Sequence, residues 1–327
     1  MKILILGSGS FAGQALFSDL KKNGFNVVGI NRSPVKSKEY WPWIKKFNDG
    51  FNWLSFNIKK EPEKFKSLLK SINPTHIIDF MGQGMVAQSW EDPKLWYSTN
   101  LAEKSFILES IRDLSELKKY VRASTPEVYG SNNSFINEDS HFKPSTPYAI
   151  SHAAIDFHLR CMGDKYNFPY SIGRFSNFYG EGQQLYRVIP RAILSCLTGK
   201  KFILEGNGMS RRSFIYSSDI AESIKLLLFK AQNKSEFNFS GDEEITIKDL
   251  IKLICEITNN SYEKIVEIGP DRPSKDMIYR LDCRKAKQTF NWSPNVNLKT
   301  GLQKTIQWIE QNIHFFSNEN WNYIHKD

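Results

Sequence analysis

The chain has 327 residues, of which 40% are hydrophobic and 24% charged, and its formal net charge is +9. This composition is ordinary for a globular protein and excludes disordered, collagen-like and coiled-coil chains. No apolar run approaches the ~20 residues of a membrane span, and the run after Met1 is shorter than the ~7–15-residue core of a signal peptide. We therefore expect a cytoplasmic protein with no membrane partner.

The excess positive charge is spread along the chain in lysine pairs, without a zinc-finger or other nucleic-acid-binding signature. We therefore expect no nucleic-acid partner. The excess positive charge then indicates either a phosphate-bearing ligand or a basic surface without a partner. The four cysteines lie far apart, and no cysteine–histidine cluster has the spacing of metal ligands. We accordingly expect no metal site.

The first thirty residues predict a strand, a glycine-rich turn, a helix and a second strand. The apolar run at 2–6 ends at Gly7, a helical pattern covers 14–23, and Gly24 precedes another apolar run at 25–30. Such a strand–helix–strand unit is right-handed, with its two strands parallel.

The alternation of strands and helices continues to about residue 176. Strands are expected at 55–58, 76–81, 120–124 and 169–174, and helices at 61–72, 93–114 and 148–165. Later helices are expected at 187–198, 218–231, 247–257 and 300–313. We predict an α/β fold, with a doubly wound parallel sheet of the Rossmann type at 1–176, to which later segments return. A smaller, irregular α/β lobe at 177–327 would bind substrate at the carboxyl edge of the sheet.

The turn after the first strand has the glycines that a dinucleotide site requires. Gly7, Gly9 and Gly13 let the backbone approach a pyrophosphate, and the helix start supplies N–H donors from Ser10 and Phe11. The alternative is a tight turn that uses glycine only for its backbone freedom. The position of the turn favours dinucleotide binding.

The end of the second strand predicts which dinucleotide is bound. Enzymes that use NAD commonly have Asp or Glu here for the ribose 2′-hydroxyl. This chain has Asn31 and Arg32 instead, and a guanidinium favours a 2′-phosphate. We predict NADP, with NAD as the alternative.

Several further motifs follow in a fixed order: SWEDP at 89–93, STPEVYG at 124–130, PYAISH at 147–152, RFSNFYG at 174–180, RSFIY at 212–216 and RPSKD at 272–276. Each is modest alone. The ordered series resembles the extended short-chain dehydrogenases that act on nucleotide-diphosphate sugars, and the resemblance covers nearly the whole chain.

Tyr148 and His152 are four residues apart at a helix start and so share one face. The resemblance implies that Tyr148 takes a sugar hydroxyl proton while the nicotinamide takes the hydride. In the family the second residue is a lysine, whose charge lowers the pKa of the tyrosine and whose amine binds the ribose. A neutral His152 could still bind the ribose. A protonated His152 could bind the ribose and also lower the pKa of Tyr148, and activity would then depend steeply on pH.

The segment at 124–130 indicates the reaction. The resemblance implies that Thr125 binds the reacting sugar hydroxyl and that Glu127 is the carboxylate of 4,6-dehydratases, which removes the C5 proton. Pro126 stands where related enzymes have an acidic Asp, so Glu127 would serve as both base and acid. We predict a nucleotide-sugar 4,6-dehydratase. A C4 epimerase, a UDP-glucuronate-type decarboxylase and a non-catalytic dinucleotide-binding protein remain alternatives, the last because of His152.

The resemblance also implies binding roles for residues outside these motif centres. Those near the cofactor are Asn57, Ile58 and Asn100; those near the nucleotide sugar are Asn177, Arg212 and Arg272. It further implies a homodimer, in which the helices at 93–114 and 148–165 pair with their mates.

Overall fold

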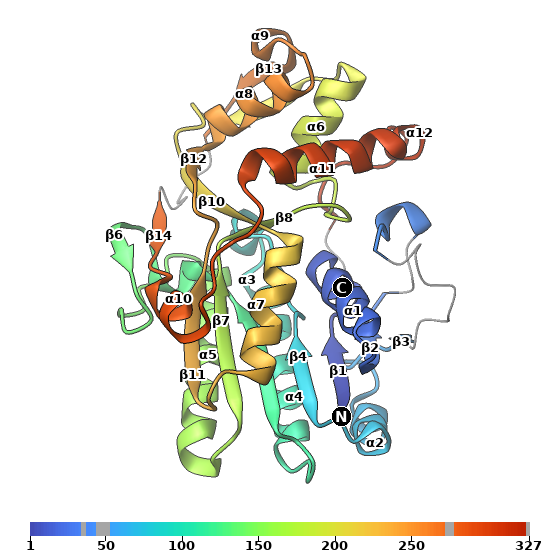
Figure 1. Ribbon diagram of the computed structural model, residues 1–327, viewed down its shortest axis with the longest axis vertical. Coiled ribbons are helices and arrows are strands. Elements are labelled where there is room, and N and C mark those ends of the chain that lie inside the picture. Colours follow the sequence, from blue (N-terminus) through green and yellow to red (C-terminus); the bar gives the residue numbers. More distant parts are fainter. Residues whose placement is uncertain (34–36, 44–52, 272–277, 325–327) are drawn as a thin grey trace.

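The computed structural model describes residues 1–33, 37–43, 53–271 and 278–324. A sheet of seven parallel strands forms its centre (Figure 1). In spatial order the strands are β11 (Ser235–Phe239), β7 (Tyr170–Phe175), β5 (Lys119–Ser124), β4 (His76–Asp79), β1 (Lys2–Leu6), β2 (Asn26–Asn31) and β3 (Trp53–Ser55). The predicted doubly wound α/β fold is confirmed.

Helices cover both faces of this sheet, as the burial of its central strands on both faces requires. Ile3 and Ile5 of β1 pack towards α1 (Phe11–Lys22) and α7 (Ser217–Phe229). Leu4 and Leu6 pack towards the opposite layer, which consists of α2 (Pro62–Ile72), α4 (Glu103–Arg112) and α5 (Pro147–Tyr166). Full burial of such a side chain contributes about 1.5–3 kcal/mol, so β1 is anchored from both sides.

The strand order reverses between β1 and β4. The chain proceeds from β1 to β2 and β3 in one direction, then crosses back to β4, β5, β7 and β11 in the other. Connections leave the carboxyl ends of β1 and β4 towards opposite faces, which opens a crevice there. The fold thus places its binding site at this edge.

A second lobe has a hydrophobic core of its own. Its helices are α6 (Val188–Thr198), α8 (Ile247–Ile257), α9 (Tyr262–Ile265), α11 (Leu298–Gln311) and α12 (Ile313–Phe316). Its strands are β8 (Asn177–Tyr179), β9 (Phe202–Glu205), β10 (Arg211–Tyr216), β12 (Glu244–Thr246) and β13 (Val266–Gly269). In Figure 1 the lobe lies beyond the carboxyl ends of the main strands, while α7 and β11 return to the sheet. The division at 176/177 stays a prediction.

Shorter elements complete the described chain. They are the 3-10 turns η1 (Lys38–Tyr40), η2 (Ala87–Trp90) and η4 (Pro126–Tyr129), the helices α3 (Pro93–Tyr97) and α10 (Arg284–Phe290), the π-helical turn η3 (Ser98–Ala102), and the parallel pair β6 (Asn132–Ile136) and β14 (Tyr279–Leu281). No helix in the described ranges is both long enough and apolar enough to cross a membrane.

Several predicted elements have bounds that differ from the structure by up to three residues, among them the helix predicted at 14–23, which is Phe11–Lys22, and two differences bear on the site. The strand expected at 55–58 lies at Trp53–Ser55, because the carbonyl of Asn57 accepts the N–H groups of Lys60 and Glu61 and so forms a turn. The helix expected at 93–114 is interrupted by the π-helical turn η3 and ends at Arg112. The interruption buries Asn100, whose role is described below.

Candidate active site

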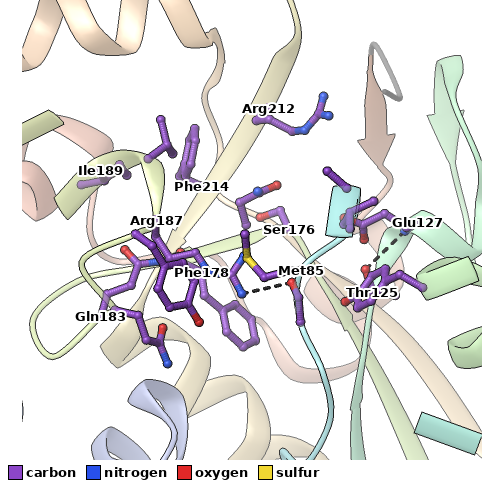
Figure 2. Close-up of a pocket in the computed structure, with 18 of the residues that line it drawn as sticks. Met85, Thr125, Glu127, Ser176, Phe178, Gln183, Arg187, Ile189, Arg212 and Phe214 are labelled. Atoms are coloured by element: carbon purple, nitrogen blue, oxygen red, sulfur yellow. Dashed lines mark hydrogen bonds between the residues drawn. The ribbon is translucent and has the colours of Figure 1, made fainter. Parts of the chain in front are cut away.

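A cleft of about 570 Å³ lies at the switch point, between the sheet and the second lobe. Segments that follow β1, β4, β5 and β7 form its floor, and residues of α6 and β10 form its roof (Figure 2). In the described chain no group of three His, Cys, Asp or Glu side chains could hold a metal ion.

The glycine turn has the geometry that a pyrophosphate needs. The side chain of Ser10 caps α1 by accepting the N–H of Gly13 at 3.0 Å, and Phe11 and Ala12 line the cleft at the helix start. A Cβ on Gly13 would lie 2.5 Å from the carbonyl oxygen of Gly7, so only glycine lets the helix pack this closely. Helix-start N–H groups facing a cleft suit an anion.

At the end of β2, Asn31 and Arg32 lie close to this turn. A Cβ on Gly9 would meet the side chain of Asn31 at 2.4 Å, and that side chain donates to the carbonyl of Ser33 at 2.7 Å. Burial raises the pKa of Glu103, and the positive charges of Lys59 and Arg32 act in the opposite direction. Arg32 and Lys59 therefore both lie near Glu103.

Of the three other residues expected near the cofactor, Asn100 and Asn57 form hydrogen bonds mainly with the backbone, and Ile58 is buried. Asn100 is buried; its Oδ1 accepts the N–H of Gln83 at 2.7 Å and its Nδ2 donates to the carbonyl of Gln83 and to Ser151 Oγ. Asn57 accepts the N–H of Lys60 at 3.2 Å, and Ile58 is buried beside it. Asn100 thereby fixes the loop after β4 against α5.

Tyr148 and His152 share one face of α5, as their spacing predicts. Their ring centroids are 4.5 Å apart, and both side chains line the cleft. Burial and the nearby Glu127 raise the pKa of Tyr148, while a hydrogen bond with Thr125 and the charge of Arg187 lower it.

His152 is electrically neutral. Burial, Arg122 and Lys104 together hold the pKa of His152 well below its ordinary value. The imidazole therefore cannot provide the positive charge that a lysine would provide at this position.

Arg122, which sequence reasoning missed, occupies the space behind His152. Its guanidinium is fully buried, its Nη2 lies 3.1 Å from Nδ1 of His152, and its Nε donates to Asp156 at 2.9 Å. Asp156 also accepts from Arg174 and from the hydroxyl of Ser124. A buried guanidinium, held by a buried carboxylate, thus lies beside α5.

Thr125 and Glu127 follow β5, and both are buried in the cleft (Figure 2). The N–H of Glu127 donates to Thr125 Oγ1 at 3.4 Å, which fixes the short turn. The hydroxyl of Tyr279, from the distant β14, donates to Oε1 of Glu127 at 3.0 Å. The structure therefore brings together Thr125, Glu127 and Tyr148 and adds Tyr279.

The second lobe presents two arginines to the cleft (Figure 2). Arg212 of β10 lies over the ring of Tyr279, with the guanidinium carbon 4.6 Å from the ring centroid. Arg187 donates to the carbonyl of Gly84 at 3.1 Å and so ties α6 to the loop after β4. Asn177 also lines the cleft, whereas Arg272 falls outside the described residues.

Arg122, Arg187 and Tyr279 carried only weak sequence signals. Arg122 is a charged residue in the middle of a buried strand, and Arg187 directly precedes a helix. Tyr279 contacts Glu127 across 152 residues of chain. A charged side chain within a buried strand was the one signal that could have been followed, because such a charge needs a partner.

The residues present fit a dinucleotide. A helix start with a capping serine faces the cleft, two glycines leave no room for a Cβ, and basic side chains gather at the end of β2. In the described structure, Nε2 of His152 is buried without a hydrogen-bond partner, which suits a donor that awaits a ligand.

Comparison with known proteins gives one family. The model of the GDP-mannose 4,6-dehydratase family matches residues 4–305. The human dTDP-D-glucose 4,6-dehydratase is 33% identical over 226 residues, which are 67% of this chain and 63% of that protein. The Escherichia coli dTDP-glucose 4,6-dehydratase is 26% identical over 363 residues, covering 98% of this chain and 95% of the relative.

Another relative is a trifunctional UDP-glucose 4,6-dehydratase of Arabidopsis thaliana, 26% identical over 95% of this chain. The chain spans 47% of that protein's length, and 63% of the human relative's.

Solved structures agree on the fold. A dTDP-glucose 4,6-dehydratase of Streptomyces venezuelae with NAD has a TM-score of 0.89 at 23% identity, over 96% of this chain and 98% of that one. A UDP-glucose 4-epimerase of Thermotoga maritima with UDP-glucose has a TM-score of 0.86 at 25% identity, over 96% of this chain and all of the other.

Proposed function

The chain belongs to the GDP-mannose 4,6-dehydratase family, and from this premise we propose that it is a nucleotide-diphosphate-sugar 4,6-dehydratase. The reaction oxidises C4 of the sugar transiently and removes water across C5 and C6, which leaves a 4-keto-6-deoxy sugar. The proposal rests on one observation: Thr125, Glu127 and Tyr148 lie together in one cleft. A base for a hydroxyl proton and a carboxylate for a carbon-bound proton are the two groups that this reaction needs.

Tyr148 is the proposed base for the C4 hydroxyl. When bound, a nicotinamide would supply a two-electron store for the hydride that leaves C4 and is needed at C6. The phenol oxygen of Tyr148 takes the hydroxyl proton, and Thr125 orients the hydroxyl. Burial raises the pKa of Tyr148, so its ionisation depends on the positive charges of Arg187 and Arg122, which lower that pKa.

Glu127 is the proposed base and acid for the loss of water. Once C4 is a ketone, the proton on C5 is acidic, and the Glu127 carboxylate removes it. Glu127 then gives the proton to the departing C6 oxygen, because Pro126 has none to give. When C6 is reduced, C5 takes up a proton from water, which balances the C4 hydroxyl proton that Tyr148 has taken and releases to water. The hydrogen bond from Tyr279 holds the carboxylate in place during both transfers.

Arg212 and Asn177 are the proposed contacts for the nucleotide diphosphate and sugar, and Arg272 is a third on the strength of its motif. A guanidinium suits a phosphate because it donates two parallel hydrogen bonds. Arg212 also packs over Tyr279, which joins the phosphate end of the cleft to its catalytic end.

For the cofactor we propose NADP. Arg32 and Lys59 gather positive charge near the end of β2, and no carboxylate stands at Asn31 or Arg32. Fluorescence titration should show tighter binding of NADP than of NAD, and Arg32→Ala should weaken NADP alone by about tenfold or more. If the parent protein binds NAD more tightly than NADP, the proposal is wrong and NAD is the cofactor.

The function is tested with purified protein, cofactor and three substrates in parallel: dTDP-glucose, UDP-glucose and GDP-mannose. One of them should lose water, seen by mass spectrometry, and give a 4-keto product. Tyr148→Phe is the control and should retain dinucleotide binding without forming product.

Other outcomes identify the alternatives. A product of unchanged mass with inverted C4 would indicate an epimerase, and loss of carbon dioxide from UDP-glucuronic acid a decarboxylase. Binding of dinucleotide and nucleotide sugar without any turnover would indicate a non-catalytic protein. Each of these results contradicts the dehydratase proposal while leaving the family membership unchanged.

The assembly and location of the protein complete the proposal. An exposed stripe on α5, made of Ile150, Phe157 and Cys161, supports a homodimer in which this helix packs on its mate. Phe157→Glu should convert a dimer to a monomer in sedimentation. All four cysteines are free thiols, which supports a reducing compartment such as the cytoplasm.

A further inference from the structure

The contact between Arg122 and His152 fixes which nitrogen of the imidazole carries the proton. A guanidinium has only donors, so Nη2 of Arg122, 3.1 Å away, donates to Nδ1 of His152. Nδ1 must then be the unprotonated nitrogen, and the hydrogen of the neutral ring lies on Nε2. In the described structure Nε2 has no partner, and His152 lines the cleft, so the ring holds one N–H donor ready for a ligand.

The same contact determines where the positive charge lies. His152 is neutral, and its charged neighbours are Arg122 on β5 and Lys104 on α4. Lys104 is neutralised by the buried Asp79. Asp156, one turn further along α5, pairs with both Arg122 and Arg174. Around Tyr148, burial and Glu127 raise the pKa, whereas Arg187 and Arg122 lower it. Of these two arginines, Arg122 is the one that also touches His152.

We propose that Arg122 is a positioning residue, and that Arg122 and His152 divide between them the two tasks of the lysine found at position 152 in the family. His152 presents Nε2–H to the ribose of the cofactor. Arg122 holds His152 in that tautomer and, together with Arg187, supplies the permanent positive charge that Tyr148 needs. This inference rests on the proposed function for its catalytic part, whereas the tautomer is a property of the protein alone.

The tautomer is measured directly by nitrogen NMR of ¹⁵N-histidine-labelled protein, with the His152 signals assigned by their loss in His152→Gln. The parent should show an unprotonated Nδ1 and a protonated Nε2 at neutral pH. Arg122→Met removes the donor and should shift the ring to a mixture or to the Nδ1–H form. A parent protein with Nδ1–H, or an Arg122→Met variant with an unchanged tautomer, would overturn the proposal.

The charge is tested by the pH dependence of kcat. Loss of the cation should lower kcat of Arg122→Met about tenfold to a hundredfold at pH 7 and move the rise of kcat to higher pH, with KM little changed. Arg122→Lys, which keeps a cation, should recover most of this loss. Arg160→Met is the matched control, because Arg160 lies in the same ionic network but pairs with Glu236.

A double variant separates this role from a merely structural one. Lysine at position 152 next to Arg122 would place two cations in one buried site, so His152→Lys alone should lose stability and activity. In the Arg122→Met background the same change should raise kcat at least about tenfold, because the single lysine then performs both tasks. A double variant no more active than Arg122→Met overturns the proposal.

The two proposals fail in different ways. If the parent protein converts none of the three nucleotide sugars, the proposed function is wrong, and the NMR measurement still decides the tautomer. If the parent is active and Arg122→Met has the parent's tautomer and pH profile, the function stands and the role of Arg122 is wrong.

Discussion

The hydroxyl of Tyr279 donates a 3.0 Å hydrogen bond to Oε1 of Glu127, although 152 residues separate them in sequence. The contact exists because β14 pairs in parallel with β6, the strand that follows the Glu127 turn. Glu127 itself belongs to a short 3-10 turn, of which it is the second residue. The Glu127 carboxylate is thus oriented by a strand from the far end of the chain.

Replacement of Glu127 should separate the two halves of the reaction. Glu127→Gln keeps the shape but cannot take the C5 proton, so we expect loss of water to slow by about 10²–10⁴-fold. Oxidation at C4 should continue, and reduced dinucleotide should accumulate, which its near-ultraviolet absorbance reports. A Glu127→Gln variant with normal product formation contradicts the role of this carboxylate.

Tyr279→Phe should have a smaller effect of the same kind. The carboxylate remains but loses one donor, so we expect product formation to fall about tenfold, with C4 oxidation unaffected. Tyr166→Phe, on the exposed part of α5, is the matched control and should behave as the parent protein. Equal rates in Tyr279→Phe and the parent would limit Tyr279 to a structural contact.

His76 should make folding stability depend on pH. Burial and the charges of Lys118 and Lys119 lower its pKa to about 4. The unfolded chain therefore binds this proton more readily than the folded chain, and stability is lost as the pH falls from about 6.5 towards 4.

This dependence can be isolated by urea unfolding of the parent and of His76→Gln between pH 7.5 and 4.5. We expect the variant to gain stability relative to the parent as the pH falls. His314→Gln, an exposed histidine, is the matched control. A stability difference between His76→Gln and the parent that is constant over this range would contradict the expected linkage.

Breaking the buried ion pair of Lys104 and Asp79 should cost more unfolding free energy than breaking an exposed ion pair. Both side chains are almost fully buried, and Asp79 also accepts from the hydroxyl of Tyr120 at 2.6 Å. Lys104→Met leaves the carboxylate without its cation, so we expect a loss of about 3–5 kcal/mol of unfolding free energy.

The exposed pair of Lys66 and Glu63 provides the comparison for Lys104. Lys66→Met should cost less than about 1 kcal/mol, because solvent screens such a pair. Similar losses for the two methionine variants, measured by urea unfolding, would show that burial does not distinguish these pairs.

The parallel strands and the glycine turn could be predicted from sequence because buried strands are short apolar runs and the turn needs glycine. The turn at Asn57 could not be predicted from sequence, because it is formed by backbone hydrogen bonds that no apolar pattern reveals. Tyr148, Thr125 and Glu127 belong to local motifs, so sequence could bring them to one site. Arg122 and Tyr279 act through contacts between distant segments, which a linear pattern does not contain.

The buried ionic chain from Arg122 through Asp156 and Arg174 to Glu236 has a consequence for the response of the protein to salt. Mobile ions screen exposed charges within a Debye length of about 8 Å at physiological ionic strength, but they do not enter a packed interior. The field that Arg122 exerts on Tyr148 should therefore persist in concentrated electrolyte, whereas attraction of a diphosphate to Arg212 should weaken. Ionic strength should thus act on substrate capture and leave the chemical step largely unaffected.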